Sequence, residues 1–250
     1  MPETIFTVNR SIGYSETGPD GRLKVGSAFD FLQDAAADHA VRLGVSAADL
    51  MVLNLGWVLR QYHLTVKRHP AHGESIRIST WRHSHRRLYE LREYEMEDDS
   101  GNRIMHARSS WVLINLQSRK PLRLDRNLHH RENGRAISWA VPSPPHPKRV
   151  DREITFPVRR HDLDVNRHAN NAVFIQWALD TAPPETADTF FLKEINALFI
   201  AEALEGDALT SQAQMTEGGD SLSFLHRIVD IKTGRELSRM QSFWQHRSGF

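Results

Sequence analysis

The chain has 250 residues and a net charge of +1, with 40% hydrophobic and 25% charged residues, an ordinary composition for a globular protein that gives no support to a nucleic-acid binder. It contains no cysteine, which excludes disulfides, a cysteine nucleophile and cysteine-ligated zinc. Because the first residues lack a signal-peptide pattern and no apolar run approaches the roughly 20 residues of a membrane helix, we expect a soluble, cytoplasmic protein.

The predicted elements follow the same order twice along the chain. A short strand over residues 4–9 precedes an amphipathic helix over 27–43. In the second half, a strand over 152–158 precedes an apolar helix that Pro183 and Pro184 are expected to end. Each helix is followed by strands, which we predict at 57–66, 74–81, 88–97 and 102–114, and at 192–203, 207–215, 221–231 and 235–245.

Two glycines, a serine and a tryptophan recur at one constant spacing, which indicates an internal duplication. Any hairpin turn favours glycine, but that preference does not explain the shared serine and tryptophan. One helix with an antiparallel sheet forms an α+β unit, so we expect two such units in tandem. The matched pairs, each 133 residues apart (206 − 73 in the first), are Gly73 with Gly206, Gly101 with Gly234, Ser109 with Ser242, and Trp111 with Trp244.

A proline-rich stretch separates the two copies. Four of the eleven prolines lie at Pro142, Pro144, Pro145 and Pro147. Each proline fixes φ and lacks an N–H donor, so we expect an extended linker there. The predicted division is an N-terminal unit at residues 1–130, a linker at 131–150 and a C-terminal unit at 151–250.

The segment "RRHDLDVNRHANNAVFIQWALD" carries the richest chemistry of the chain. Asp164, Asn166 and His168 occupy alternate positions, which would share one side of an extended segment. Asn170 or Asn171 can cap the helix that follows, and the first N–H groups of a helix can polarise a carbonyl oxygen. Asp164 can orient His168, and Asn166 adds a neutral donor. The same residue types also suit an ordinary helix-capping turn, so both interpretations stay open at this point.

This motif resembles the signature of the acyl-acyl-carrier-protein thioesterases, bacterial and plant enzymes that end fatty-acid synthesis by hydrolysing the acyl thioester. The resemblance extends to "FLQDAAADHAVRLG", "WVLRQYHLTVKRHPAHGESIRISTW" and "ARSSWVLIN" in the first copy. It implies two tandem hot-dog units that form a pseudo-dimer in one chain, each a long helix wrapped by an antiparallel sheet. It also implies that the first unit walls the acyl pocket, with the choice of chain length made around the helix at 27–43 and the strand from Trp57.

The resemblance implies a catalytic set in the second unit: Asp164, Asn166, His168, and a glutamate on the following strand that falls on Glu202. The plant enzymes carry a cysteine after that glutamate, but Ala203 stands there in this chain, which rules out a covalent cysteine mechanism. We expect direct attack by water, with Glu202 as the base and Asn166 with a helix N–H as donors to the oxyanion. Attack by Asp164 to form an anhydride stays an alternative. No cofactor and no metal is implied, and the first copy lacks the catalytic set.

The implied partner is an acyl carrier protein that carries a fatty acyl chain. Because that protein is acidic, the basic runs at 82–87 and 148–152, or Arg159 and Arg160, are candidate docking sites, although simple surface exposure explains them as well. We expect no nucleic-acid or membrane partner, and a homodimer is a further candidate assembly. Three other functions fit the residues: a hot-dog acyl-CoA thioesterase, a hot-dog enoyl-thioester hydratase, whose motif has proline where Arg167 stands, and a non-catalytic acyl-binding module.

Overall fold

The computed structural model describes residues 5–85, 88–128 and 141–247, so most of the first half of the predicted linker, 131–140, lies outside the described residues. None of the helices described is long and apolar enough to cross a membrane. The chain divides into unit 1, which is Met1–Tyr62 with Lys67–Val141, and unit 2, which is His63–Val66 with Pro142–Phe250.

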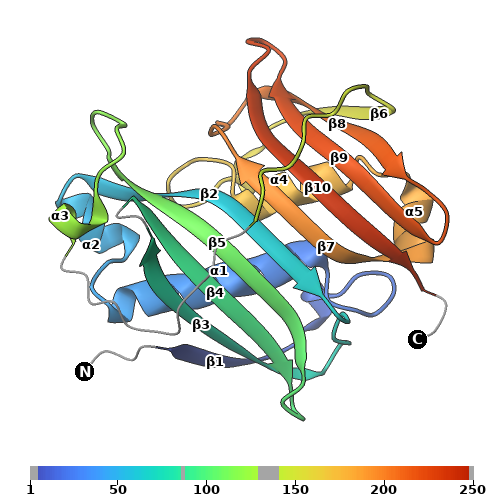
Figure 1. The fold of residues 1–250 in the computed structure, drawn as a ribbon, viewed down its shortest axis with the longest axis horizontal. Coiled ribbons are helices and arrows are strands. Elements are labelled where there is room, and N and C mark those ends of the chain that lie inside the picture. Colours follow the sequence, from blue (N-terminus) through green and yellow to red (C-terminus); the bar gives the residue numbers. More distant parts are fainter. Residues whose placement is uncertain (1–4, 86–87, 129–140, 248–250) are drawn as a thin grey trace. The chain divides into compact units, whose positions relative to one another are not determined.

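Unit 1 consists of a long helix against an antiparallel sheet, with short helices beside it. Its elements are β1 (Phe6–Ser11), η1 (Tyr14–Glu16), α1 (Val25–Arg42), α2 (Ala47–Val52), β2 (Leu55–Val66), β3 (Ser75–His85), β4 (Tyr89–Asp98), β5 (Arg103–Asn115) and α3 (Leu124–Asn127). The strands follow the order β1-β3-β4-β5-β2. Helix α1 packs on β1 and β3 (Figure 1), and its buried side chains recur at helical spacing, as in Phe29, Leu32 and Ala36.

Unit 2 repeats this plan with a shorter helix. Its elements are β6 (Arg152–Pro157), η2 (Arg160–Asp162), α4 (Asn171–Leu179), α5 (Pro184–Thr189), β7 (Phe190–Phe199), β8 (Ala208–Glu217), β9 (Ser221–Asp230) and β10 (Glu236–His246). The strands follow the order β6-β8-β9-β10-β7, which matches the order in unit 1 strand for strand. Helix α4 packs on β8, β9 and β10. The α+β class predicted from the sequence is confirmed.

The repeated residues have the same structural roles in both units. The indole N–H of Trp111 donates to Ser109 Oγ at 2.8 Å, and that of Trp244 donates to Ser242 Oγ at 3.0 Å. Both pairs of glycines lie in hairpin or loop turns that require a positive φ, which glycine adopts at little cost. Their φ angles are 78° for Gly73 and 87° for Gly206, and 79° for Gly101 and 69° for Gly234. The duplication in the sequence is therefore a duplication of structure.

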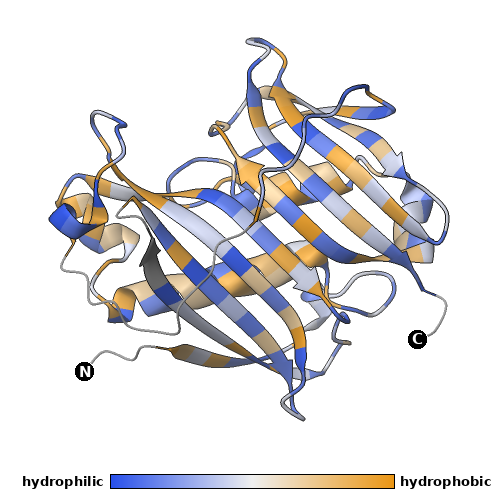
Figure 2. Cartoon of the chain, in the orientation of Figure 1, coloured by the Kyte–Doolittle hydropathy of each residue, from blue (hydrophilic) through white to orange (hydrophobic). Residues whose placement is uncertain are grey.

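Alternating side chains give each sheet a buried and an exposed face. Tyr94 and Met96 of β4 are fully buried, whereas Glu95 between them points to the other face and pairs with Arg103 at 2.9 Å. Figure 2 shows this alternation as hydrophilic and hydrophobic bands along the strands of both sheets. Such alternation is what a sheet needs when a helix covers one of its faces.

The prediction that Pro183 and Pro184 end the second helix is wrong. Helix α4 already ends at Leu179, and the two prolines instead open α5, with Pro183 as its N-cap and Pro184 as its first residue. Proline suits that place because its missing N–H would have no partner in the first turn of a helix.

The described part of the predicted linker is fastened to unit 2 by hydrogen bonds. The Pro142 carbonyl accepts from Asn196 Nδ2 at 2.7 Å, and the Pro144 carbonyl accepts from Arg239 Nη1 at 3.0 Å. The Lys148 N–H donates to the side-chain oxygen of Gln214 at 2.6 Å. Since the prolines have no N–H of their own, side chains of the sheet supply the donors that hold this extended segment.

His226 of β9 is a buried histidine that should make unit 2 sensitive to acid. Its Nε2 lies 2.8 Å from Ser242 Oγ, and burial lowers its pKa from 6.5 to about 3. The folded state therefore keeps the neutral ring, whereas the unfolded chain binds a proton near pH 6.5. This group contributes stability that is complete above pH 6.5 and is lost as the pH falls from there towards 3.

We expect the free energy of unfolding to fall by about 1.4 kcal/mol per pH unit below pH 6 through this one group. A His226→Gln variant keeps a hydrogen-bonding side chain but does not titrate, so its unfolding free energy should depend less steeply on pH. Urea unfolding of both proteins at pH 7 and pH 5 measures the two slopes. Equal slopes would show that His226 is not the titrating group.

Candidate active site

The predicted catalytic segment forms a tight turn between η2 and α4. The Asp164 N–H donates to the His168 carbonyl at 2.8 Å, and the Arg167 N–H donates back to the Asp164 carbonyl at 3.0 Å. Arg167 has a left-handed φ of 62°, and Leu163 bridges to Ala169 across the turn. The expectation of an extended segment with three side chains on one side is therefore wrong.

The side chain of Asp164 explains the turn. Its Oδ1 accepts from the Asn166 N–H at 2.8 Å and from the His168 N–H at 3.4 Å, and its Oδ2 lies 3.4 Å from Asn166 Nδ2. An aspartate that binds backbone N–H groups two to four residues ahead competes with extended structure and closes a turn. In this structure Asp164 positions His168 through the backbone N–H.

The imidazole of His168 faces Glu202. Its Nε2 lies 3.5 Å from Glu202 Oε2, and the two side chains are 30% and 37% exposed. The Ala169 N–H donates to the Ala203 carbonyl at 2.9 Å, which ties the turn to the segment that carries the glutamate. A histidine and a carboxylate are thus held side by side within reach of solvent, as general acid–base chemistry with water requires.

Glu202 does not lie on a strand, contrary to the prediction. Strand β7 ends at Phe199. The N–H groups of Ile200 and Ala201 then both donate to the Leu237 carbonyl, at 2.8 and 3.0 Å. Two successive donors on one acceptor break the regular ladder, so the chain leaves the sheet before it reaches the glutamate.

Helix α4 starts directly beside this pair. Asn170 is its N-cap and accepts from the Ala172 N–H at 2.9 Å, which confirms one of the two expected caps. The Asn170 N–H donates to the Asp162 carbonyl at 2.8 Å. This cap uses one of the N–H groups of the first turn, and such a helix start favours a developing negative charge.

The four residues predicted from the sequence are therefore close together: three on one turn and Glu202 on the segment tied to it. Sequence reasoning missed the backbone bond between Ala169 and Ala203, because backbone groups leave no signal in residue type. In the part of the chain that the structure describes, no three histidine, aspartate or glutamate side chains gather in a way that could hold a metal ion.

Two family models match the chain: the acyl-ACP thioesterase N-terminal domain over residues 3–131, and the acyl-ACP thioesterase C-terminal domain over residues 145–246. The chain belongs to the acyl-ACP thioesterase family. The resemblance stated from the motif is thus confirmed.

Known proteins extend this match. The chain is 25% identical to oleoyl-acyl carrier protein thioesterase 1 of Arabidopsis thaliana, over 92% of this chain and 73% of the relative. A crystal structure of a putative oleoyl thioesterase from Lactobacillus plantarum superposes with a TM-score of 0.85 at 24% identity, covering 97% of this chain and 96% of the other. The 12:0-ACP thioesterase of Umbellularia californica gives a TM-score of 0.85 at 20% identity, covering 99% and 96%. These structures share the fold, and the predicted tandem hot-dog class is confirmed.

Unit 1 of this acyl-ACP thioesterase keeps the turn but not its side chains. The Gly18 N–H donates to the Arg22 carbonyl at 2.8 Å, as in the catalytic turn 146 residues later (164 − 18). Gly21 has a φ of 70°, close to the 62° of Arg167. By position, the residues that replace Asp164, Asn166 and His168 are Gly18, Asp20 and Arg22.

A second repeated bond locates the counterpart of Glu202 in unit 1. The Leu23 N–H donates to the Pro70 carbonyl at 2.9 Å, which is the bond that ties the catalytic turn to its neighbouring segment in unit 2. His69, the residue before Pro70, therefore takes the place of Glu202. A histidine is not a carboxylate base, so this acyl-ACP thioesterase has the predicted set in unit 2 and not at the matched place in unit 1.

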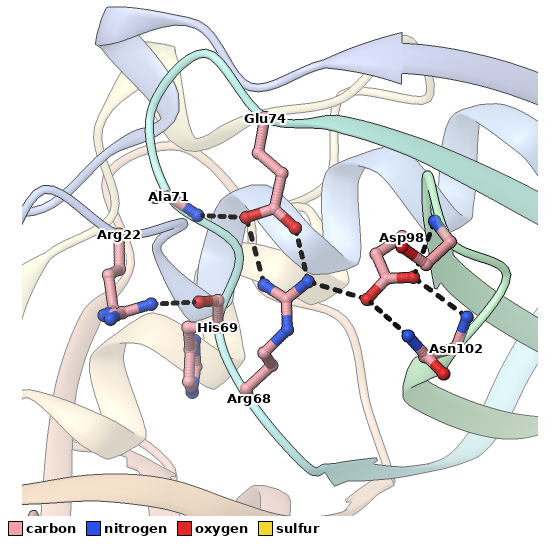
Figure 3. A network of polar contacts seen from close by, with 8 residues as sticks. Arg22, Arg68, His69, Ala71, Glu74, Asp98 and Asn102 are labelled. Carbon is pink, nitrogen blue, oxygen red and sulfur yellow. Dashed lines mark hydrogen bonds and ion pairs between the residues drawn. The ribbon is translucent and has the colours of Figure 1, made fainter. Parts of the chain in front are cut away.

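Structural contacts occupy the matched place in unit 1. Arg22 Nη1 donates to the His69 carbonyl at 2.9 Å, and next to it Arg68 bonds Glu74 and Asp98 at 3.0 Å each (Figure 3). The pKa of the Glu74 carboxyl is lowered by its hydrogen bond to Arg68. These side chains hold loops together, and their charges are already paired with one another.

Proposed function

We propose that the turn from Asp164 to His168, together with Glu202, hydrolyses the fatty acyl thioester by direct attack of water. As a member of the acyl-ACP thioesterase family, the chain is a thioester hydrolase that releases free fatty acid from fatty acyl-ACP. The observation that carries the assignment of residues is the 3.5 Å separation between His168 Nε2 and Glu202 Oε2, beside the start of α4.

In this mechanism Glu202 removes a proton from water, and the water oxygen bonds to the acyl carbon. The carbonyl oxygen becomes an oxyanion, which accepts hydrogen bonds from the Asn166 amide and from an N–H of the first turn of α4. The carbon–sulfur bond then breaks, the carrier leaves as its thiol with the proton taken from water, and the fatty acid is released. His168 and Asp164 keep the base and the turn in place.

The conformation of Arg167 favours hydrolysis over hydration of an enoyl thioester. Its φ is 62°, whereas proline is fixed near −65°, so the proline of the hydratase motif does not fit this turn. An acyl-CoA thioesterase and a non-catalytic acyl-binding module remain to be separated by experiment.

Release of free thiol from acyl-ACP and acyl-CoA substrates of graded chain length tests the proposal. We expect one thiol and one fatty acid per acyl-ACP consumed, with acyl-CoA the poorer substrate. Preferred cleavage of acyl-CoA would support the CoA alternative, and binding without thiol release would support the acyl-binding module. Hydration of enoyl thioesters in the same preparation would support the hydratase.

For the division of labour, we propose that residues 1–130 wall the acyl chain, that 131–150 connect, and that 151–250 catalyse. The two family models, which end at residue 131 and resume at 145, support this division. The cytoplasmic location and the homodimer stay predictions from the sequence.

A further inference from the structure

Three arginines lie on the outer side of the catalytic turn. Arg159 and Arg160 stand at the start of η2, and Arg167 stands within the turn, and all three are exposed. Within the described ranges, none of their guanidinium groups has an ion-pair or hydrogen-bond partner, in contrast to most other arginines of the chain. Unpaired, exposed guanidinium groups at one place are a cationic surface that can receive carboxylates.

The carboxylates of the same segment do not neutralise this surface. Asp162 is 7% exposed, and its Oδ2 accepts from the Arg159 backbone N–H at 2.7 Å. Asp164 is occupied by the backbone N–H of Asn166 at 2.8 Å. Both carboxylates thus serve backbone donors, while the guanidinium groups face solvent. Val165 at the tip of the turn is 93% exposed and adds an apolar contact beside the charges.

The backbone at Arg167 indicates that its side chain is used. A side chain other than glycine at a positive φ is uncommon because its Cβ crowds the backbone. Unit 1 makes the same turn with Gly21, at a φ of 70°. A chain that needed only the turn would gain by having glycine at both places, so retention of arginine in unit 2 points to a function for the guanidinium.

The other basic runs are less suited to docking. Arg82 is only 11% exposed and is paired with Glu90 at 3.1 Å. Arg149 is paired with Asp151 at 2.7 Å, and its pKa is raised by that hydrogen bond. Residues 86–87 of the first run lie outside the described residues.

We propose that Arg159, Arg160 and Arg167 form the surface on which the acidic face of the acyl carrier protein docks. This proposal rests on the proposed function, because it is the acyl thioester of that carrier which has to reach His168. Arginine binds carboxylates through paired N–H groups, and a cationic surface around a site speeds the approach of an acidic partner. Arg167 adjoins His168 in sequence, so the docked surface lies beside the site that receives the acyl arm.

The first test measures binding of acyl carrier protein by fluorescence anisotropy at low and high salt. The variants are Arg160→Glu and Arg167→Gly, the second of which keeps the left-handed turn that Gly21 makes in unit 1. We expect the combined variant to bind about tenfold more weakly at low salt and to lose most of the salt dependence. Arg235→Glu is the matched control, since it reverses an exposed arginine in the hairpin between β9 and β10. Equal weakening by Arg235→Glu, or none by the combined variant, would overturn the proposal.

The second test compares thiol release from acyl-ACP, acyl-CoA and acyl-pantetheine, which offer an acidic protein, phosphate groups only, and neither. We expect the KM to rise about tenfold for acyl-ACP alone. An equal rise for acyl-CoA would mean that the arginines bind phosphate, and an equal loss on acyl-pantetheine would mean that they support the site itself; either result overturns the docking proposal. If the wild-type chain binds the carrier through these arginines but releases no thiol from any substrate, the proposed function fails and the docking surface stands.

Discussion

Glu202→Gln should fold and bind acyl substrate as the wild type does, but its kcat should be lower by about 10²–10⁴. The amide keeps the size of the carboxylate but cannot take a proton from water. A loss of this size corresponds to about 2.7–5.5 kcal/mol of transition-state stabilisation. Because the base acts only during reaction, the loss should appear in kcat and not in KM, which steady-state thiol release separates.

Two variants on the same segment control for this result. Glu205→Gln removes an exposed carboxylate three residues further on, and Ala203→Ser changes the position where plant relatives have cysteine. Both should keep kcat within about tenfold of the wild type, since the mechanism uses neither side chain. A folded Glu202→Gln protein with more than about a tenth of the wild-type kcat would remove Glu202 from the role of base. Asp164 would then be the next candidate, as base or as nucleophile.

Asn166→Ala should lower kcat by about 10²–10³, because it removes one donor to the oxyanion. The amide nitrogen has two hydrogens. One is directed at Asp164 Oδ2, 3.4 Å away, which leaves the other for the developing oxyanion. Single-turnover and steady-state rates of thiol release, with the melting temperature of each protein, measure the effect and exclude unfolding as its cause.

The hairpin between β4 and β5 offers a close match for this variant. Asn102 is also exposed, and its backbone N–H and Nδ2 bond Asp98 at 2.9 and 3.3 Å, much as Asn166 bonds Asp164 (Figure 3). Asn102→Ala loses the same type of contact outside the site, so its kcat should stay within about twofold of the wild type. If both alanine variants lose activity equally, the Asn166 effect is a matter of folding and not of oxyanion stabilisation.

The sequence predicted the class of fold because the relevant signals are local and periodic. Alternating residues gave the strands, and the pairs spaced by 133 residues gave the duplication. Before the helices the matched spacing is 146 residues, and it falls to 133 after them because α1 has 18 residues and α4 has 9. That earlier part of the repeat was invisible in the sequence, since Gly18 and Arg22 share no chemistry with Asp164 and His168.

The predicted site was less complete than the predicted fold. The motif and its family resemblance identified the right residues to bring together, but not their geometry. Asp164 closes a turn by binding backbone N–H groups, and this choice between an extended segment and a turn depends on bonds that residue type does not fix. Glu202 left its strand because two successive N–H groups share the Leu237 carbonyl, which only the folded partner strand can supply.

The central claim is that catalysis belongs to the turn in unit 2 and not to its counterpart in unit 1. The most direct test is the kcat of thiol release from acyl-ACP for His168→Ala and Arg22→Ala, which alter matched positions of the two turns. We expect His168→Ala to lose at least about 10² in kcat and Arg22→Ala to stay within about tenfold of the wild type. A folded Arg22→Ala protein that loses as much activity as His168→Ala, or a His168→Ala protein with near-wild-type turnover, would contradict this account.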